Sequence, residues 1–277
     1  MRSKLSILCI PIYKGQKRIG VKYSPDYFIN TLFNYSLKNQ IKQSITKLRI
    51  ENLPLSESLI KTKNYVKKSV KSDFDLFIGG DHSISMGTIS GILNKSKNKD
   101  DYVILWLDAH PDCNTFKTSS TKNIHGMPIA GLLGLLPSPY DNFTCLNESQ
   151  IMIIGSRSID EGEQEFLEKS NIKNLTMSRI KEIGIHKSIE EIKSFIKNKK
   201  IHISFDVDCL DPKILSSTGT PVSNGFNEKE IELILNELSQ NNVKSMDVVE
   251  FNPRIGNPQK SFDVLSRILS NFINKVL

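Results

Sequence analysis

Acidic residues and histidines of this 277-residue chain gather directly after short apolar runs. The groups are Gly79-Gly80-Asp81-His82-Ser83, Asp108-Ala109-His110-Pro111-Asp112, Asp206-Val207-Asp208 and Glu250. Residues i, i+2 and i+4 of an extended segment share one side, so alternate members of such a group can project together. Carboxylates held in one small space repel each other strongly unless a cation neutralises them. The pattern therefore indicates a cation site.

The types of these side chains indicate which cation. The candidate ligands are His82, Asp108, His110, Asp112, Asp206 and Asp208. Oxygen-rich ligation with imidazoles suits a divalent ion such as Mn²⁺ better than a structural zinc, which favours thiolates. Six ligands exceed what one ion needs, which predicts two ions bridged by shared carboxylates. The alternative is that each Asp only caps a turn or a helix. That explanation would have to apply to every one of the groups at once.

Apolar runs alternate with helical patterns along most of the chain. The expected strands are Leu5–Pro11, Leu76–Ile78, Tyr102–Leu107, Ile151–Ile154, Ile201–Val207 and Val243–Val249. The expected helices are Ser24–Lys38, Leu55–Ser72, Ser83–Asn94, Ser188–Asn198, Asn227–Leu238 and Gln259–Val276. Continuously apolar strands are typical of a parallel sheet that is buried on both faces. We therefore predict one α/β domain over residues 1–277, a three-layer αβα sandwich with a mostly parallel central sheet.

This arrangement explains where the acidic groups fall. Ligands of open parallel sheets bind beyond the carboxyl ends of the strands, and the acidic groups follow the expected strands at those ends. Cys113 and Cys209 adjoin candidate ligands, but strand alternation turns them to the opposite side, so we expect core thiols. His186 and His202 have no acidic motif around them and are expected to be structural or surface residues.

Composition narrows the class of protein. The net charge is +7, but the lysines are spread along predicted helices and loops, which favours a solvated surface over a nucleic-acid-binding face. The four cysteines have no CxxC spacing, which suits a reducing compartment. No apolar stretch approaches the 18 residues that a membrane span needs. We expect a cytoplasmic protein with a small-molecule substrate and with neither a nucleic-acid nor a membrane partner.

Taken in order, these motifs resemble the arginase (ureohydrolase) family. The resemblance also includes the opening loop Tyr13–Val21, the segment Ser204-Phe205-Asp206-Val207-Asp208 and the end motif Glu250-Phe251-Asn252-Pro253. It covers most of the chain, and several long motifs in the right order are specific. The resemblance implies an arginase-like fold and a hydrolase that cleaves a C–N bond of L-arginine to give L-ornithine and urea. It also implies a homo-oligomer, a trimer or a hexamer.

The resemblance assigns roles to the candidate ligands. One Mn²⁺ would be held by His82, Asp108, Asp112 and Asp206, and the other by His110, Asp108, Asp206 and Asp208. Asp108 and Asp206 would bridge the two ions, and Asp112 also counts among the catalytic residues. The ions would lower the pKa of a bridging water, and the hydroxide would attack the guanidinium carbon.

The resemblance also implies which residues contact the substrate. Glu250 would pair with the guanidinium, and His125 would protonate the leaving amine. The other implied substrate contacts are Asn114, Ser119 and Thr121 for the α-carboxylate, Asp160 and Glu163 for the α-amino group, and Thr220. The chain departs from the family at Cys209, where a glycine is common, and at Ser158, where an acid is common.

Two other functions stay open at this point. The first is a sister amidinohydrolase that acts on agmatine or another guanidino compound, because only the α-carboxylate contacts separate it from an arginase. The second is a non-catalytic descendant of the fold that binds metal or nucleic acid. The complete ligand set, together with His125 and Glu250, argues against the second.

Overall fold

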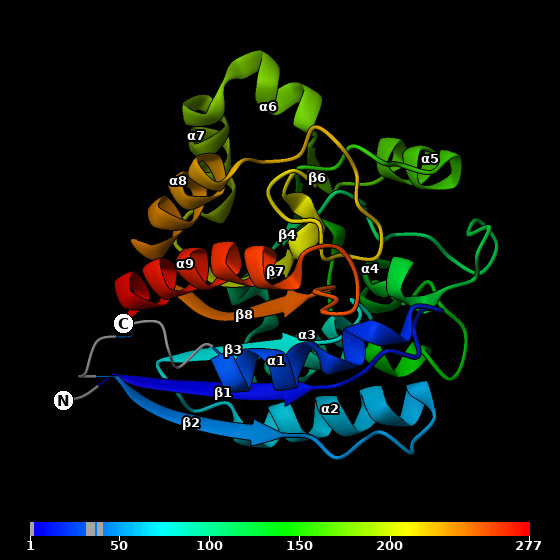
Figure 1. The fold of residues 1–277 in the computed structure, drawn as a ribbon. Helices are drawn as coiled ribbons and strands as arrows, with labels where there is room; N and C mark the ends of the chain where they lie inside the picture. The colour runs from blue at the N-terminus through cyan, green and yellow to red at the C-terminus, as the bar shows by residue number, and fades with distance from the viewer. Residues whose placement is uncertain (1–2, 32–36, 38–40) are drawn as a thin grey trace.

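The protein is built around one twisted sheet (Figure 1). The computed structural model describes residues 3–31, 37 and 41–277. The eight strands lie in the order β2-β1-β3-β8-β7-β4-β5-β6, and each pairing between them is parallel. Their bounds are β1 Lys4–Ile10, β2 Lys42–Lys47, β3 Phe74–Gly79, β4 Tyr102–Leu107, β5 Ile151–Ile154, β6 Lys173–Leu175, β7 Lys200–Asp206 and β8 Val243–Val249.

Helices cover both faces of the sheet, which confirms the expected α/β sandwich (Figure 1). Their bounds are α1 Ser24–Thr31, α2 Leu55–Ser69, α3 Ile84–Lys95, α4 Pro128–Leu132, α5 Glu161–Lys169, α6 Met177–Ile183, α7 Ile185–Ile196, α8 Glu228–Ser239 and α9 Pro258–Val276. Successive side chains of a strand point to opposite faces. Ile7 accordingly joins the core beneath α1, α8 and α9, while Leu8 joins the core beneath α2 and α3.

The elements that sequence analysis missed are short or polar. β2 is an exposed edge strand with the sequence Lys-Gln-Ser-Ile-Thr-Lys, so it lacks the apolar run that marked the other strands. β6 is a three-residue strand at the other edge. The short helices α4, α5 and α6 were also not predicted. The expected helix Ser24–Lys38 is helical as far as Thr31, and its later part lies largely outside the described residues.

The strand order brings the acidic groups together. β3, β8, β7 and β4 are consecutive neighbours in the sheet and are parallel, so their carboxyl ends lie along one edge. His82, Asp108, Asp206 and Glu250 each follow or end one of these strands. None of the helices in the described ranges is long and apolar enough to cross a membrane.

Candidate metal centre

A tight turn after β3 delivers the first histidine. The chain passes so close to the segment that follows β1 that a Cβ at Gly80 would lie 1.8 Å from the carbonyl oxygen of Ile12. Only glycine allows such an approach. The amide of the next residue, Asp81, then donates to that same carbonyl at 2.9 Å. His82 follows and projects over the ends of the neighbouring strands.

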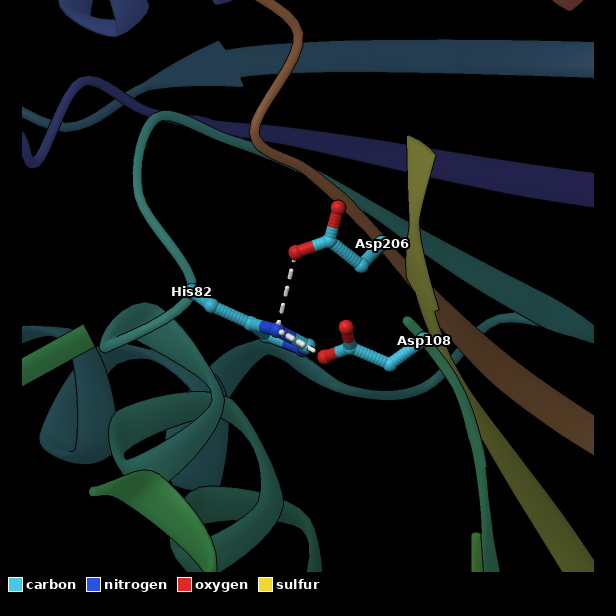
Figure 2. Close-up of side chains that lie close together, drawn as sticks. All are labelled: His82, Asp108 and Asp206. Carbon is cyan, nitrogen blue, oxygen red and sulfur yellow. Dashed lines mark ion pairs between the residues drawn. The ribbon is translucent and has the colours of Figure 1, made fainter. Parts of the chain in front are cut away.

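His82 faces the carboxylates of Asp108 and Asp206 (Figure 2). Its Nδ1 atom lies 3.1 Å from Asp108 Oδ2 and 3.1 Å from Asp206 Oδ2. Asp112 Oδ2 lies 3.0 Å from the same nitrogen. All four side chains are buried. The structure therefore unites the four residues that the resemblance assigned to one ion.

A second group adjoins the first. His110 Nδ1 lies 3.4 Å from Asp108 Oδ1 and 3.2 Å from Asp208 Oδ2. Asp108 thus turns one carboxylate oxygen toward each histidine. Ligand atoms of His82, Asp108 and Asp206, and likewise those of Asp108, His110 and Asp208, lie within 4.8 Å of one another. Two cations could be held side by side with Asp108 between them.

The donor set fits divalent cations. His82 Nδ1 is buried, and none of the three carboxylates around it in the described structure is aligned for a hydrogen bond to this atom. Its distances to the carboxylates match adjacent ligands of an octahedral ion, which are about 3 Å apart when each bond is about 2.1 Å. Burial and then Asp108 raise the pKa of Asp112 to about 6. Burial, followed by the charges of Asp208 and Asp108, raises the pKa of Asp206 well above its usual range. Bound cations would relieve this repulsion.

Trp106 fixes two of these candidate ligands. Its ring stacks on His82 with centroids 4.2 Å apart and planes at 15°. Its Nε1–H donates to Asp108 Oδ2 at 3.0 Å. The backbone amide of His110 donates to the other Asp108 oxygen at 2.7 Å. Trp106 was not singled out from the sequence, where it reads only as part of a buried strand.

The second aspartate pair is held in a similar way. The backbone amide of Asp208 donates to Asp206 Oδ1 at 2.8 Å, and this bond caps the short 3₁₀ turn Val207–Cys209. Thr220 Oγ1 donates to Asp208 Oδ2 at 2.9 Å. The turn replaces the extended geometry expected at Val207. Cys209 is nevertheless in the core, as expected, and so is Cys113.

Two residues of the site have left-handed backbone. Asp112 has a φ of 52° and Glu250 a φ of 65°. Positive φ is uncommon for residues other than glycine and is tolerated when the surroundings impose it. The carbonyl of Asp112 accepts from Ile129 N, and the amide of Glu250 donates to Gly80 O. These bonds hold both carboxylates toward the centre.

The buried Glu250 pairs with the half-buried His125 beside the metal groups. Glu250 Oε1 accepts from the His82 amide at 2.9 Å and lies 3.0 Å from His125 Nδ1. Its other oxygen accepts from Gln16 Nε2 at 2.6 Å. Burial lowers the pKa of His125, but the Glu250 carboxylate outweighs burial and raises that pKa to about 9. Gln16, in the opening loop, was not predicted as a site residue.

Asn114 and Asp160 lie in contact with each other. Asn114 Nδ2 donates to Asp160 Oδ2 at 2.9 Å, and Asn114 Oδ1 accepts from Thr118 Oγ1 at 2.8 Å. Glu163 is buried, and its carboxylate accepts from the amides of Asp160 and Cys113. The structure thus gives Glu163 a capping position at the start of α5, and its contact with an α-amino group stays a prediction.

Ser119 and Thr121 lie next to each other in the same loop. Their hydroxyl oxygens are 3.4 Å apart, and Ser119 Oγ accepts from the amide of Lys122 at 3.0 Å. Thr220 donates to Asp208 Oδ2, which places it beside the metal centre, and its contact with substrate stays a prediction. His186 is exposed, and His202 is buried against Ser245 Oγ at 2.8 Å.

Fold and site together define an α/β protein with a buried carboxylate and imidazole centre suited to two divalent cations. The sequence profile of the arginase family matches residues 3–273. An arginase of Entamoeba histolytica is 32% identical over 289 residues, covering 97% of each chain. The chain belongs to the arginase family.

Solved structures agree with this assignment. The crystal structure of the Entamoeba histolytica arginase in complex with L-ornithine superposes with a TM-score of 0.90 at 30% identity, covering 98% of this chain and 97% of that one. The arginase of Bacillus subtilis superposes with a TM-score of 0.87 at 31% identity, covering 98% of both chains. The resemblance inferred from the sequence motifs is therefore confirmed.

Proposed function

We propose that this protein is an arginase that hydrolyses L-arginine to L-ornithine and urea with two Mn²⁺ ions per chain. The observation that carries the proposal is the pair of ligand groups sharing Asp108, with Glu250 and His125 directly beside them. Family membership and the L-ornithine complex of a relative support the same reaction. The whole chain serves as one catalytic domain in this proposal.

The proposed metal ligands keep the assignment made from the motifs. His82, Asp108, Asp112 and Asp206 would hold one ion, and His110, Asp108, Asp206 and Asp208 the other. The pair of cations, when bound, would supply water activation at neutral pH. The chain contributes a cluster of carboxylates whose mutual repulsion bound cations would relieve. Mn²⁺ is favoured because the set has oxygen and imidazole donors and no thiolate.

Glu250 and His125 would act on the guanidinium. A buried carboxylate suits a planar cation that donates two hydrogen bonds. Glu250 would receive the guanidinium in place of the contacts that it makes with His125 and Gln16. His125 would then be free to give its proton to the leaving amine nitrogen. Before the guanidinium binds, the Glu250 carboxylate raises the pKa of His125 to about 9, so the ring enters the reaction carrying its proton at neutral pH.

The loop after Asp112 would recognise the amino-acid end of the substrate. Ser119 and Thr121 would donate to the α-carboxylate, directly or through water. Asn114 would do so while it holds Asp160 in place for the α-ammonium. These contacts separate arginine from agmatine, which lacks the carboxylate. An agmatine hydrolase is therefore the alternative within the same class of enzyme.

The reaction can be tested with a small substrate panel. Purified protein is incubated with MnCl₂ and then with L-arginine, agmatine or another guanidino compound, and urea is measured. We expect urea chiefly from L-arginine. Equal or faster release from agmatine would move the assignment to a sister amidinohydrolase. Absence of urea with every compound would contradict an amidinohydrolase function.

The free thiols of all four cysteines support a cytoplasmic location for this activity.

Replacing His125 with asparagine tests the acid role. We expect the H125N variant to lose about 10²-fold or more in kcat, the typical contribution of a positioned acid or base. Its manganese content should stay at the wild-type level, because the ring faces Glu250 and lies outside both ligand groups. Full turnover in H125N would place the proton donor elsewhere. The exposed His186 offers a control, and H186N should match the wild type.

We also propose that the protein is a homo-oligomer, a trimer or a hexamer. The resemblance to the family is the support for this proposal. Light scattering at micromolar concentration should give a mass of three or six chains. A mass of 31.3 kDa, that of one chain, would contradict it.

A further inference from the structure

A series of buried polar side chains, linked by hydrogen bonds, lies beneath the metal centre on the side of His82 that faces away from the carboxylates. His82 Nε2 lies 2.8 Å from Ser204 Oγ, and Ser204 Oγ lies 3.2 Å from Ser85 Oγ. Ser85 Oγ donates to Asp247 Oδ2 at 2.7 Å. The series crosses from β7 to α3 and then to β8, and each of its side chains is at most 1% exposed. The proposed reaction makes no use of Ser85 or Asp247.

We infer that Ser85 and Asp247 are positioning residues that fix the ring nitrogen by which His82 binds its metal ion. The inference rests on the metal pair proposed above. A histidine ligand must offer a lone pair from one ring nitrogen, and a hydrogen bond at the other nitrogen decides which one it is. In this protein the hydrogen bond at His82 Nε2 is connected through Ser204 and Ser85 to the buried carboxylate of Asp247.

The direction of each hydrogen bond follows from Asp247. The hydroxyl of Ser85 donates to Asp247 Oδ2, which uses the single proton of Ser85. Ser85 must then accept from Ser204, which uses the only proton of Ser204. Ser204 is left as an acceptor toward His82, so Nε2 carries a proton. The lone pair of His82 is thereby placed on Nδ1, the atom that faces three carboxylates.

Asp247 is itself held from two sides. His202 Nε2 lies 3.3 Å from Asp247 Oδ2, and Thr88 Oγ1 donates to that same oxygen at 2.8 Å. Thr88 and Ser85 are both buried in α3 and both donate to Asp247. Only Ser85 also contacts Ser204. Thr88 therefore provides a matched control that removes a hydroxyl from Asp247 without breaking the series of hydrogen bonds to His82.

Loss of this series of hydrogen bonds should weaken the binding of only one of the two ions. His82 belongs to one ligand group, and His110 serves the other. In S85A, the Ser204 proton is released from Ser85 and can turn toward His82 Nε2, which favours a proton on Nδ1. We expect S85A to bind one Mn²⁺ as tightly as the wild type and the other roughly 10- to 100-fold more weakly, the usual effect of removing such a partner. T88V should keep both affinities within about twofold.

The experiment is a titration of metal-free protein with MnCl₂, with free Mn²⁺ measured by electron paramagnetic resonance. Thermal unfolding of each metal-free variant shows how much stability is lost. Failure of the wild type to bind two ions would contradict the metal pair itself. The positioning role of Ser85 and Asp247 would be overturned if S85A bound both Mn²⁺ ions with unchanged affinity. It would also be overturned if T88V weakened binding as much as S85A does. If S85A does not fold, D247A replaces it, because alanine cannot accept the Ser85 proton. The same selective loss is expected, and two unchanged affinities would contradict the inference.

Discussion

Replacing Asp108 with alanine should lower hydrolysis of L-arginine by on the order of 10³-fold or more. Asp108 directs one oxygen toward each histidine, so its loss weakens both cation sites at once. Bound cations supply several kcal/mol of transition-state stabilisation, and each 1.4 kcal/mol corresponds to a factor of ten. Metal analysis of D108A after gel filtration should show that both ions are retained poorly.

Asp208 provides the matched comparison. It belongs to the group of His110 and has no contact with His82, so D208A should keep one ion and lose the other. Both variants should fold, because removing one carboxylate from a repelling cluster relieves the metal-free protein. Circular dichroism of the metal-free proteins checks this. Two firmly bound ions in D108A would show that Asp108 does not bridge.

The preference for L-arginine over agmatine is the second large effect that we expect. The two substrates share the guanidinium and the aliphatic stem, so the metal centre and Glu250 treat them alike. A site built to bind a charged group rejects an analogue without it, because its own polar groups are left unsatisfied. Several hydrogen bonds to a charge, each worth roughly 1.5–3 kcal/mol, predict a ratio of kcat/KM on the order of 10³ or more.

Asn114 should carry part of this preference. N114A loses a donor for the α-carboxylate and also releases Asp160, whose carboxylate the Asn114 amide holds at 2.9 Å. We expect KM for L-arginine to rise with little change in kcat, as loss of ground-state binding requires. Agmatine serves as the internal control, since its carboxylate contact is absent from the start. An unchanged ratio in N114A would remove Asn114 from substrate recognition.

The candidate ligands were predictable because each lies at the end of an apolar strand. Strand period and the carboxyl-end rule are enough to place His82, Asp108 and Asp206 at one edge of the sheet. The same reasoning missed β2, since an exposed edge strand has no apolar run. It also misjudged Val207, where a 3₁₀ turn capped by Asp206 replaces extended backbone.

The contacts that hold the ligands were not predictable. Ser85 and Asp247 are 162 positions apart, and their hydrogen bond depends on how α3 packs against β8. Local pattern carries no information on that packing. The bonds of the Glu163 carboxylate to the amides of Asp160 and Cys113 were likewise not predictable from its position in the sequence. Motifs therefore indicate candidate reactive side chains, and the structure shows which residues orient them.

The most direct test is to measure both products from one preparation of manganese-loaded protein supplied with L-arginine. We predict that urea and L-ornithine appear in equal amounts, that a chelator stops their formation, and that added Mn²⁺ restores it. Protein that retains two bound ions per chain and still releases no urea from L-arginine would contradict the proposed function.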